Sequence, residues 1–240
     1  TGTIPSSFSF LPNIVSLTLN SNCLTGPVLS PLPLQLQVID VSDNMLSGLL
    51  PTHWCSGECQ VYSIGVGGNY IHGDIPSSLG DLSKLSTLNI SWNSLSSSIP
   101  STISAYTRLR DVDFSSNYLT GVLDTIVGMS SLSQLSLSNN LLSGPVRYLC
   151  ISSTLAHLTL NDNYLTGSLS FNCSPPAKRL FVLDVSNNLL SGSLPTVYSG
   201  TPNIMQLHLK SNFFTSTIPP GLCNLPYLLL LDLGTNEITG

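Results

Sequence analysis

The sequence is poor in charged residues, because Asp, Glu, Lys and Arg together make up only 8% of its 240 positions. Seven basic residues against twelve acidic ones give a formal net charge of -5, and there is no basic tail. Nucleic-acid binding depends mainly on contacts from Lys and Arg to phosphates, so this balance argues against a nucleic-acid partner. The polar surface has to come mainly from Ser, Thr and Asn, which favours an extracellular protein over a cytosolic one.

Long hydrophobic runs are also missing from the sequence. No stretch reaches the roughly 18 consecutive apolar residues of a membrane-spanning helix. The first residues, 1–5, lack the basic and apolar regions of a signal peptide. We therefore expect membrane attachment only through segments outside this stretch of sequence.

What the sequence does contain is an internal repeat of 22 to 25 residues. Each copy starts with an apolar residue and places further apolar residues three and five positions later. The ten copies begin at Ile14, Leu36, Val61, Leu85, Leu109, Leu132, Leu155, Leu180, Ile204 and Leu228. A fixed period of this length indicates a solenoid whose copies form stacked coils. We expect residues 1–240 to form one such domain, a fragment of a longer protein without a cap at either end.

Every copy has an asparagine eight positions after its start. These residues are Asn22, Asn44, Asn69, Asn93, Asn117, Asn140, Asn163, Asn188, Asn212 and Asn236. A buried Asn side chain can bond the backbone of its own turn and of the next coil, because it both donates and accepts hydrogen bonds. We interpret the set as a structural asparagine ladder.

The alternation of apolar and polar residues before each asparagine, as in Leu17-Thr18-Leu19, predicts a short strand with its apolar side inward. Stacked copies of this strand predict a parallel sheet. After the asparagine, most copies continue with Leu, Ser or Thr, Gly, a variable residue and an apolar residue, followed in some copies by Pro. Residues 46–51, 71–76 and 190–195 are examples.

This pattern resembles the plant-type leucine-rich repeat of receptor-like kinase and receptor-like protein ectodomains and of some protist surface proteins. The resemblance implies an α/β-type repeat solenoid. Its right-handed superhelix would have a concave parallel sheet, with short strands, 3-10 turns and loops on the convex side. Ser97 and Ser216 replace the Gly of the pattern, and the segment 171–176 lacks its leucines. The protist alternative therefore stays open beside the plant receptor.

The six cysteines allow two disulfides to be suggested. Cys150 and Cys173 occupy the same place in adjacent copies, where stacking brings strands to about 5 Å. Cys55 and Cys59 could close a small loop. The alternative is that several cysteines are simply small buried apolar residues.

Two Asn-x-Ser triplets begin at Asn89 and Asn172. Each is a candidate N-glycosylation site in a secreted protein.

Residues suited to catalysis or metal binding are scattered. The histidines, His53, His72, His157 and His208, have no Cys or carboxylate at metal-ligand spacing on the same short strand. A solenoid also presents an open surface and not the cleft that catalysis needs. We expect no enzyme activity, no metal and no cofactor.

The variable positions of the strands form columns on the concave face, since side chains alternate along a strand. Many of these positions are acidic, which favours a basic or polar partner such as a peptide or glycan. An exposed Trp is also typical of an interaction hot spot. We place a ligand-binding site on coils three to seven, at Tyr62, Trp92, Asp111, Asp113, Gln134, Asn139, His157 and Asp162. The competing interpretation is that the acids only keep the strands soluble and that Trp92 packs on its neighbours.

These observations predict an extracellular or cell-surface protein that recognises a protein, peptide or glycan on its concave or lateral surface. It would be receptor-like or adhesive, with any signalling domain elsewhere. The alternative is a secreted leucine-rich repeat inhibitor of a cell-wall-degrading enzyme.

Overall fold

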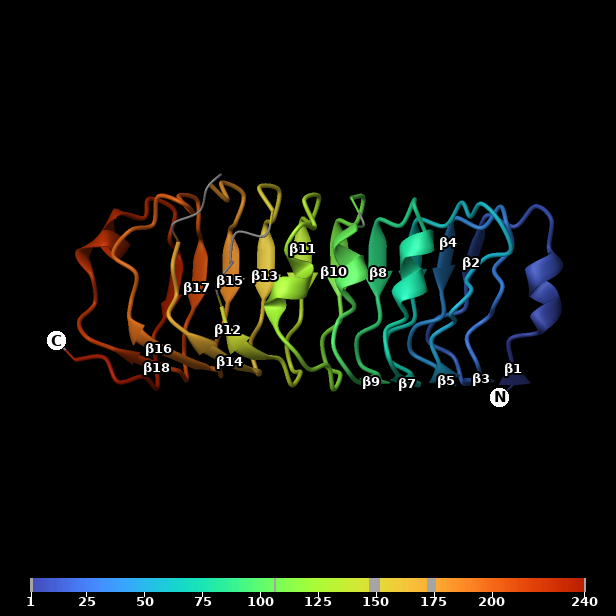
Figure 1. Cartoon of the computed structure of the whole chain (residues 1–240), viewed down its shortest axis with the longest axis horizontal. Coiled ribbons are helices and arrows are strands. Elements are labelled where there is room, and N and C mark those ends of the chain that lie inside the picture. The colour runs from blue at the N-terminus through green and yellow to red at the C-terminus, as the bar shows by residue number, and fades with distance from the viewer. Residues whose placement is uncertain (1, 106, 147–151, 172–175, 240) are drawn as a thin grey trace.

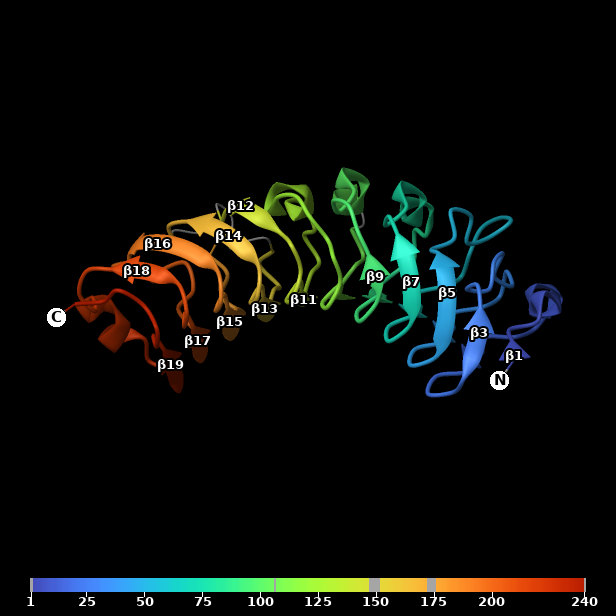
Figure 2. The same cartoon turned by 90° about the horizontal axis from the view of Figure 1, so that it is seen from below.

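The computed structural model describes residues 2–105, 107–146, 152–171 and 176–239. The chain winds as a solenoid whose two termini lie at opposite ends of the molecule (Figure 1). In the view turned by 90° about the horizontal axis, the coils form an arch, with the main sheet on its inner side and the 3-10 helices on its outer side (Figure 2).

The main sheet, called here the concave sheet, is parallel and has ten strands, one from each coil. Neighbouring strands pair without any offset, so that Ser16 lies opposite Val38 and Asp111 lies opposite Gln134. The strands are β2 (Ser16–Thr18), β4 (Val38–Asp40), β6 (Ser63–Gly65), β8 (Thr87–Asn89), β10 (Asp111–Asp113), β11 (Gln134–Ser136), β13 (His157–Thr159), β15 (Val182–Asp184), β17 (Gln206–His208) and β19 (Leu230–Asp232).

Each concave strand has three residues, and the middle one points into the core. Leu17, Ile64 and Leu158 are examples of buried middle residues, whereas the residues on either side of them are partly or fully exposed. This is the period-2 burial expected of a strand that packs on one side only. The two outward residues of every strand therefore form continuous columns on the inner face of the arch.

A second group of parallel strands, called here the lateral sheet, runs beside the concave sheet along the lower edge of Figure 1. Its first part consists of β1 (Gly2–Thr3), β3 (Leu24–Gly26), β5 (Met45–Leu49), β7 (Tyr70–Gly73) and β9 (Ser94–Leu95). Its second part consists of β12 (Ser143–Pro145), β14 (Tyr164–Gly167), β16 (Leu189–Ser193) and β18 (Phe213–Thr215). An isolated bridge between Ser98 and Thr120 extends the first part by one coil.

The outer side of the arch carries 3-10 helices and loops. The helices are η1 (Ser6–Phe10), η2 (Ser77–Asp81), η3 (Ser101–Ala105), η4 (Leu123–Ile126) and η5 (Pro220–Asn224). None of the described helices has the length and apolar character needed to cross a membrane.

The asparagines at the eighth position connect successive coils. The side-chain amide of Asn93 donates to the carbonyl of Val66 in the preceding coil at 3.0 Å and to Ile90 in its own coil at 3.1 Å. Its carbonyl oxygen accepts from the backbone N–H of Ile71 at 2.9 Å. The same pattern repeats from Asn44 to Asn212, and these eight asparagines are 5–8% exposed. Each one satisfies backbone groups that leave the concave sheet.

The leucines and isoleucines of all ten coils form one continuous hydrophobic core between the two sheets and the helices. A single coil could not bury its apolar side, so stability comes from stacking. The predicted leucine-rich repeat architecture, with its concave parallel sheet, short strands and 3-10 turns, is confirmed.

Candidate functional site

A shallow hollow of about 380 Å³ lies on the concave sheet, at the middle of the arch. Two rows of side chains from four neighbouring strands, β8, β10, β11 and β13, line it. One row is Thr87, Asp111, Gln134 and His157, and the other is Asn89, Asp113, Ser136 and Thr159. The buried residues between the rows, Leu88, Val112 and Leu135, form its floor.

The hollow brings together four of the residues predicted to bind a ligand: Asp111, Asp113, Gln134 and His157. The other four lie elsewhere. Tyr62 precedes β6, whereas Trp92 follows β8 by three residues, so they stand at opposite ends of the strands. Asn139 and Asp162 lie in the same row as Trp92, beyond the hollow.

Asp113 is engaged within its own turn. Its Oδ1 accepts hydrogen bonds from the backbone N–H of Ser115 at 3.0 Å and from the Ser115 hydroxyl at 2.6 Å. Asp184 accepts the same two bonds from Ser186. This is an Asx turn, in which the side chain replaces a backbone acceptor where the strand ends. The acids of this column therefore have a structural role as well as supplying charge.

Asp111 differs from Asp113, because no described residue forms a hydrogen bond or an ion pair with its side chain. It is partly exposed and lies opposite Thr87 on one side and Gln134 on the other. A carboxylate without an intramolecular partner, set between two neutral hydrogen-bonding side chains, is suited to bind a cationic group of a ligand.

A row of left-handed residues follows the concave strands, one before each ladder asparagine. All ten have φ between 52° and 64°: Ser21, Asp43, Gly68, Trp92, Ser116, Asn139, Asp162, Asn187, Ser211 and Thr235. Gly, Asn and Asp adopt this conformation readily, whereas a bulky residue such as Trp rarely does. Trp92 is nevertheless 68% exposed, so burial of its indole does not explain its presence. The sequence offered no obvious sign of this row, because its residue types differ from coil to coil.

The glycines of coil three are needed because side chains of neighbouring coils lie against them. A Cβ on Gly65 would stand 2.9 Å from Asp40 Oδ1, and one on Gly67 would stand 2.8 Å from Asn89 Oδ1. The Asp40 and Asn89 side chains thus occupy the space above these two glycines.

Asn89, one of the two glycosylation candidates, accepts hydrogen bonds through Oδ1 from the backbone N–H and the hydroxyl of Ser91. The other candidate, Asn172, and the suggested pair Cys150 and Cys173 lie outside the described residues.

Among the remaining cysteines, Cys55 and Cys59 are joined by a disulfide. Cys23 and Cys223 are exposed, and neither forms a disulfide with another described residue.

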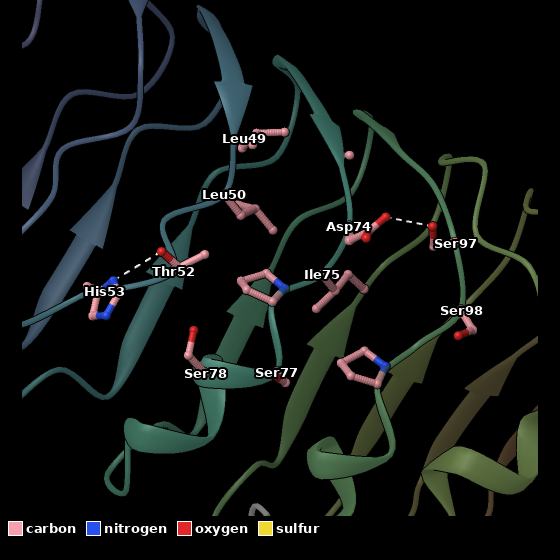
Figure 3. Close-up of a pocket in the computed structure, with 13 residues that line it drawn as sticks. Leu49, Leu50, Thr52, His53, Asp74, Ile75, Ser77, Ser78, Ser97 and Ser98 are labelled. Carbon is pink, nitrogen blue, oxygen red and sulfur yellow. Dashed lines mark hydrogen bonds between the residues drawn. The ribbon is translucent and has the colours of Figure 1, made fainter.

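A second, larger hollow of about 750 Å³ lies where the lateral sheet meets the outer loops of coils two to four (Figure 3). Leu50 and Ile75 contribute apolar surface to it. Thr52 and His53 lie on one side of it, while Asp74 and Ser97, joined by a 2.6 Å hydrogen bond, lie on the other. Sequence reasoning missed this hollow, because its residues belong to irregular segments after the repeat pattern.

The described part of the chain holds no cluster of three or more His, Cys, Asp or Glu residues that could bind a metal ion. His157 lines the concave hollow and His53 lines the larger one. The arrangement offers neutral and acidic hydrogen-bonding groups on open surfaces, which is suited to recognition.

The model of the family described as Leucine Rich Repeat matches residues 35–56, 84–105 and 203–225. Receptor-like protein 39 of Arabidopsis thaliana is 34% identical over 130 residues, which cover 52% of this chain and 14% of that protein. The match thus spans about half of this chain and about a seventh of this curated relative.

Two solved structures resemble the whole chain. A TDR receptor superimposes with a TM-score of 0.92 and is 30% identical, covering 100% of this chain and 42% of the receptor chain. The leucine-rich repeat ectodomain of the Arabidopsis receptor kinase HAESA, solved with a peptide hormone, has a TM-score of 0.87 and 31% identity. That match covers 99% of this chain and 40% of the HAESA chain.

The repeat family, the receptor-like relative and the two receptor structures agree with the asparagine ladder and the stacked coils described above. The chain has the repeats and the solenoid fold of plant-type leucine-rich repeat proteins.

Proposed function

We propose that this chain acts outside the cell as part of a receptor-like recognition domain and binds a peptide on its concave sheet. The observation that carries the proposal is the hollow formed by β8, β10, β11 and β13, with the Asp111 carboxylate, which no described residue engages, in its wall. The HAESA ectodomain was solved with a bound peptide hormone, and its match covers 99% of the present chain. That likeness supports a peptide as the ligand class.

The chemistry of the hollow favours a peptide with a basic residue. Asp111 and Asp113 place two carboxylates on one strand, two residues apart on the same side. Thr87, Gln134 and Ser136 supply neutral donors and acceptors around them. A Lys or Arg side chain would bond Asp111, and the peptide backbone would bond the hydroxyls and amides.

Panning a random peptide library displayed on phage against the immobilised chain would test this function. We expect enrichment of peptides containing Lys or Arg. A selected peptide should bind Asp111→Asn at least about tenfold more weakly, as expected when one charge-assisted hydrogen bond is lost.

Asp184→Asn provides the matched control, because Asp184 lies on the concave sheet one coil beyond the hollow and is not among its lining residues, so this change should leave affinity unchanged. Selected peptides that lack basic residues, or equal binding by Asp111→Asn and the unmodified chain, would contradict the proposal.

A further inference from the structure

The side of the arch that carries the lateral sheet exposes a column of large apolar side chains on the far side of the asparagine ladder from the concave hollow. The column consists of Met45, Tyr70, Tyr118, Leu141, Tyr164, Leu189 and Phe213, each directly after a ladder asparagine. Ser94 interrupts it between Tyr70 and Tyr118. Exposure ranges from 40% for Leu141 to 61% for Tyr70. Exposed apolar residues are usually scattered singly, and a set of them on neighbouring coils marks an interaction site.

A second column, two residues further along each coil, carries hydroxyl groups. It consists of Thr25, Ser47, His72, Ser96, Thr120, Ser143, Thr166, Ser191 and Thr215, with His72 as the exception. Neither column contains Asp, Glu, Lys or Arg anywhere between Thr25 and Thr215. The two columns together are called here the lateral strip, and they form an uncharged surface along nine coils.

The register of the lateral sheet places the two columns side by side. Ser47 lies opposite Tyr70, and Ser143 lies opposite Tyr164. Phe213 has Ser191 as its partner in the same way. Paired strands are about 4.8 Å apart, so each of these rings lies beside a hydroxyl of the preceding coil.

The tyrosine hydroxyls of the strip are also available to a ligand. Within the described residues, no hydrogen bond engages the hydroxyl of Tyr70, Tyr118 or Tyr164, and all three side chains are more than half exposed. A tyrosine presents both an apolar ring face and a polar tip, so it can contact a ligand that is itself amphipathic.

The larger hollow continues the strip onto the outer side of the arch. It begins at Leu49 of β5 and Gly73 of β7 and extends to the prolines Pro76 and Pro100. Its volume of about 750 Å³ is in the range of small-molecule sites. Among the described residues, Asp74 is the only acidic one that lines it. Apart from Asp74, the hollow has the same mixture of apolar and neutral polar groups as the strip.

We propose that the lateral strip, together with the hollow at its edge, binds an extended, uncharged polysaccharide. A sugar ring has an apolar C–H face, which packs on an aromatic ring, and a rim of hydroxyls, which bond Ser, Thr and Tyr. A polymer of identical sugars repeats its chemistry along its length, as the coils repeat theirs. The absence of charge from both columns, together with the regular pairing of rings and hydroxyls from coil to coil, matches a neutral glycan.

The triple variant Tyr70→Ala, Tyr118→Ala, Tyr164→Ala tests the proposal in the full chain. Retention would be measured by affinity electrophoresis and pull-down on neutral polysaccharides, namely cellulose, chitin, xylan, mannan and β-1,3-glucan, with polygalacturonate as the anionic comparison. We expect retention by at least one neutral polymer, little change as salt is raised, and a loss of about tenfold or more in the variant.

A control variant removes two exposed aromatics that lie outside the strip and outside the concave hollow, as Phe10→Ala and Tyr227→Ala. It should bind the polymer like the unmodified chain, and circular dichroism should show both variants folded. The proposal would be overturned by retention on polygalacturonate alone, by no retention on any neutral polymer, or by equal losses in the two variants. Neither variant changes a residue of the concave hollow, so peptide binding at Asp111 can be measured separately from polysaccharide binding, and one proposal can fail without the other.

Discussion

Asp113 accepts two hydrogen bonds from Ser115, whereas Asp111, two residues earlier on the same strand, has no side-chain bond within the described residues. The two carboxylates face the same side of β10 and differ in what holds them. Asp113 closes a turn of the protein, whereas Asp111 is not engaged by any described residue. The proposed binding role and the structural role thus fall on neighbouring outward positions of one strand.

The first prediction uses that pair. Asp113→Ala should lower the free energy of unfolding by about 1–2 kcal/mol, because the backbone N–H of Ser115 loses its acceptor. Asp111→Ala should change it by less than about 0.5 kcal/mol, as expected of a surface residue without partners. Urea unfolding monitored by circular dichroism checks both. Equal losses of stability would show that Asp111 also has a structural role.

The second prediction concerns the ladder. Asn117 donates to Ile90, Phe114 and Ser115 and accepts from Leu95, and it is buried. Asn117→Ala should therefore lower the free energy of unfolding by about 3 kcal/mol or more, because several buried backbone groups lose their hydrogen-bond partners.

Asn22 is the matched control for this change. It is exposed and donates only to Leu19 and Asn20 of its own coil among the described residues. Asn22→Ala should cost much less than Asn117→Ala in the same urea titration. A solenoid can unfold in parts, so hydrogen exchange should locate the loss around coils four to six. Similar costs at both positions would contradict a role for bonds between coils.

The third prediction concerns Trp92, whose φ of 52° is unfavourable for a large side chain. Trp92→Asn should raise the free energy of unfolding by up to about 1 kcal/mol, since Asn tolerates the left-handed conformation. Trp92→Phe keeps the strain and should leave stability close to that of the unmodified chain. Thermal melts of the three proteins compare them directly. If Trp92→Asn were the least stable of the three proteins, contacts of the indole would contribute more to stability than relief of the backbone strain.

The fourth prediction concerns Tyr198, which is 6% exposed and packs on Phe171 with ring centroids 5.1 Å apart. Its hydroxyl has no hydrogen-bond partner among the described residues. Tyr198→Phe should therefore leave the free energy of unfolding unchanged or raise it by up to about 1 kcal/mol, because a buried hydroxyl without a hydrogen-bond partner is removed. Tyr118→Phe, at an exposed position, should have no effect.

Tyr198 also predicts a dependence on alkaline pH. Burial raises the pKa of its hydroxyl well above the usual value of about 10. The unfolded chain would lose this proton first, so the contribution of Tyr198 to stability is complete below about pH 10 and is lost as the pH rises further. Urea titrations at increasing alkaline pH should show a smaller decline for Tyr198→Phe than for the unmodified chain. An identical decline would mean that other groups govern alkaline unfolding.

Much of the fold could be predicted from the sequence because its determinants recur with the period of the coil. The apolar positions and the asparagines, such as Asn69 and Asn163, lie at fixed distances from the start of each copy. Their residue type alone identifies them in the sequence. The concave columns followed from the alternation of side chains along a strand. Four of the eight predicted binding residues line one hollow for this reason.

The rest depends on geometry that residue type does not reveal. The left-handed row contains Ser, Asp, Trp and Thr as well as Gly, so composition did not mark it. Trp92 was expected beside Asp111, but the turn after β8 places it beyond the hollow. The two-residue offset in the lateral sheet, which sets Ser47 opposite Tyr70, depends on how successive coils are staggered. No local pattern in one coil contains that information.

The hydrogen bonds of the ladder join each coil only to its immediate neighbours, and every internal coil makes the same set. Removing or duplicating one whole coil would therefore leave the bonding scheme of all the others intact. The length of the arch is thus free to change in units of one coil by duplication or deletion within a gene. Surfaces that span several coils, such as the hollow around Asp111, would be divided by an event inside them, while the fold would persist.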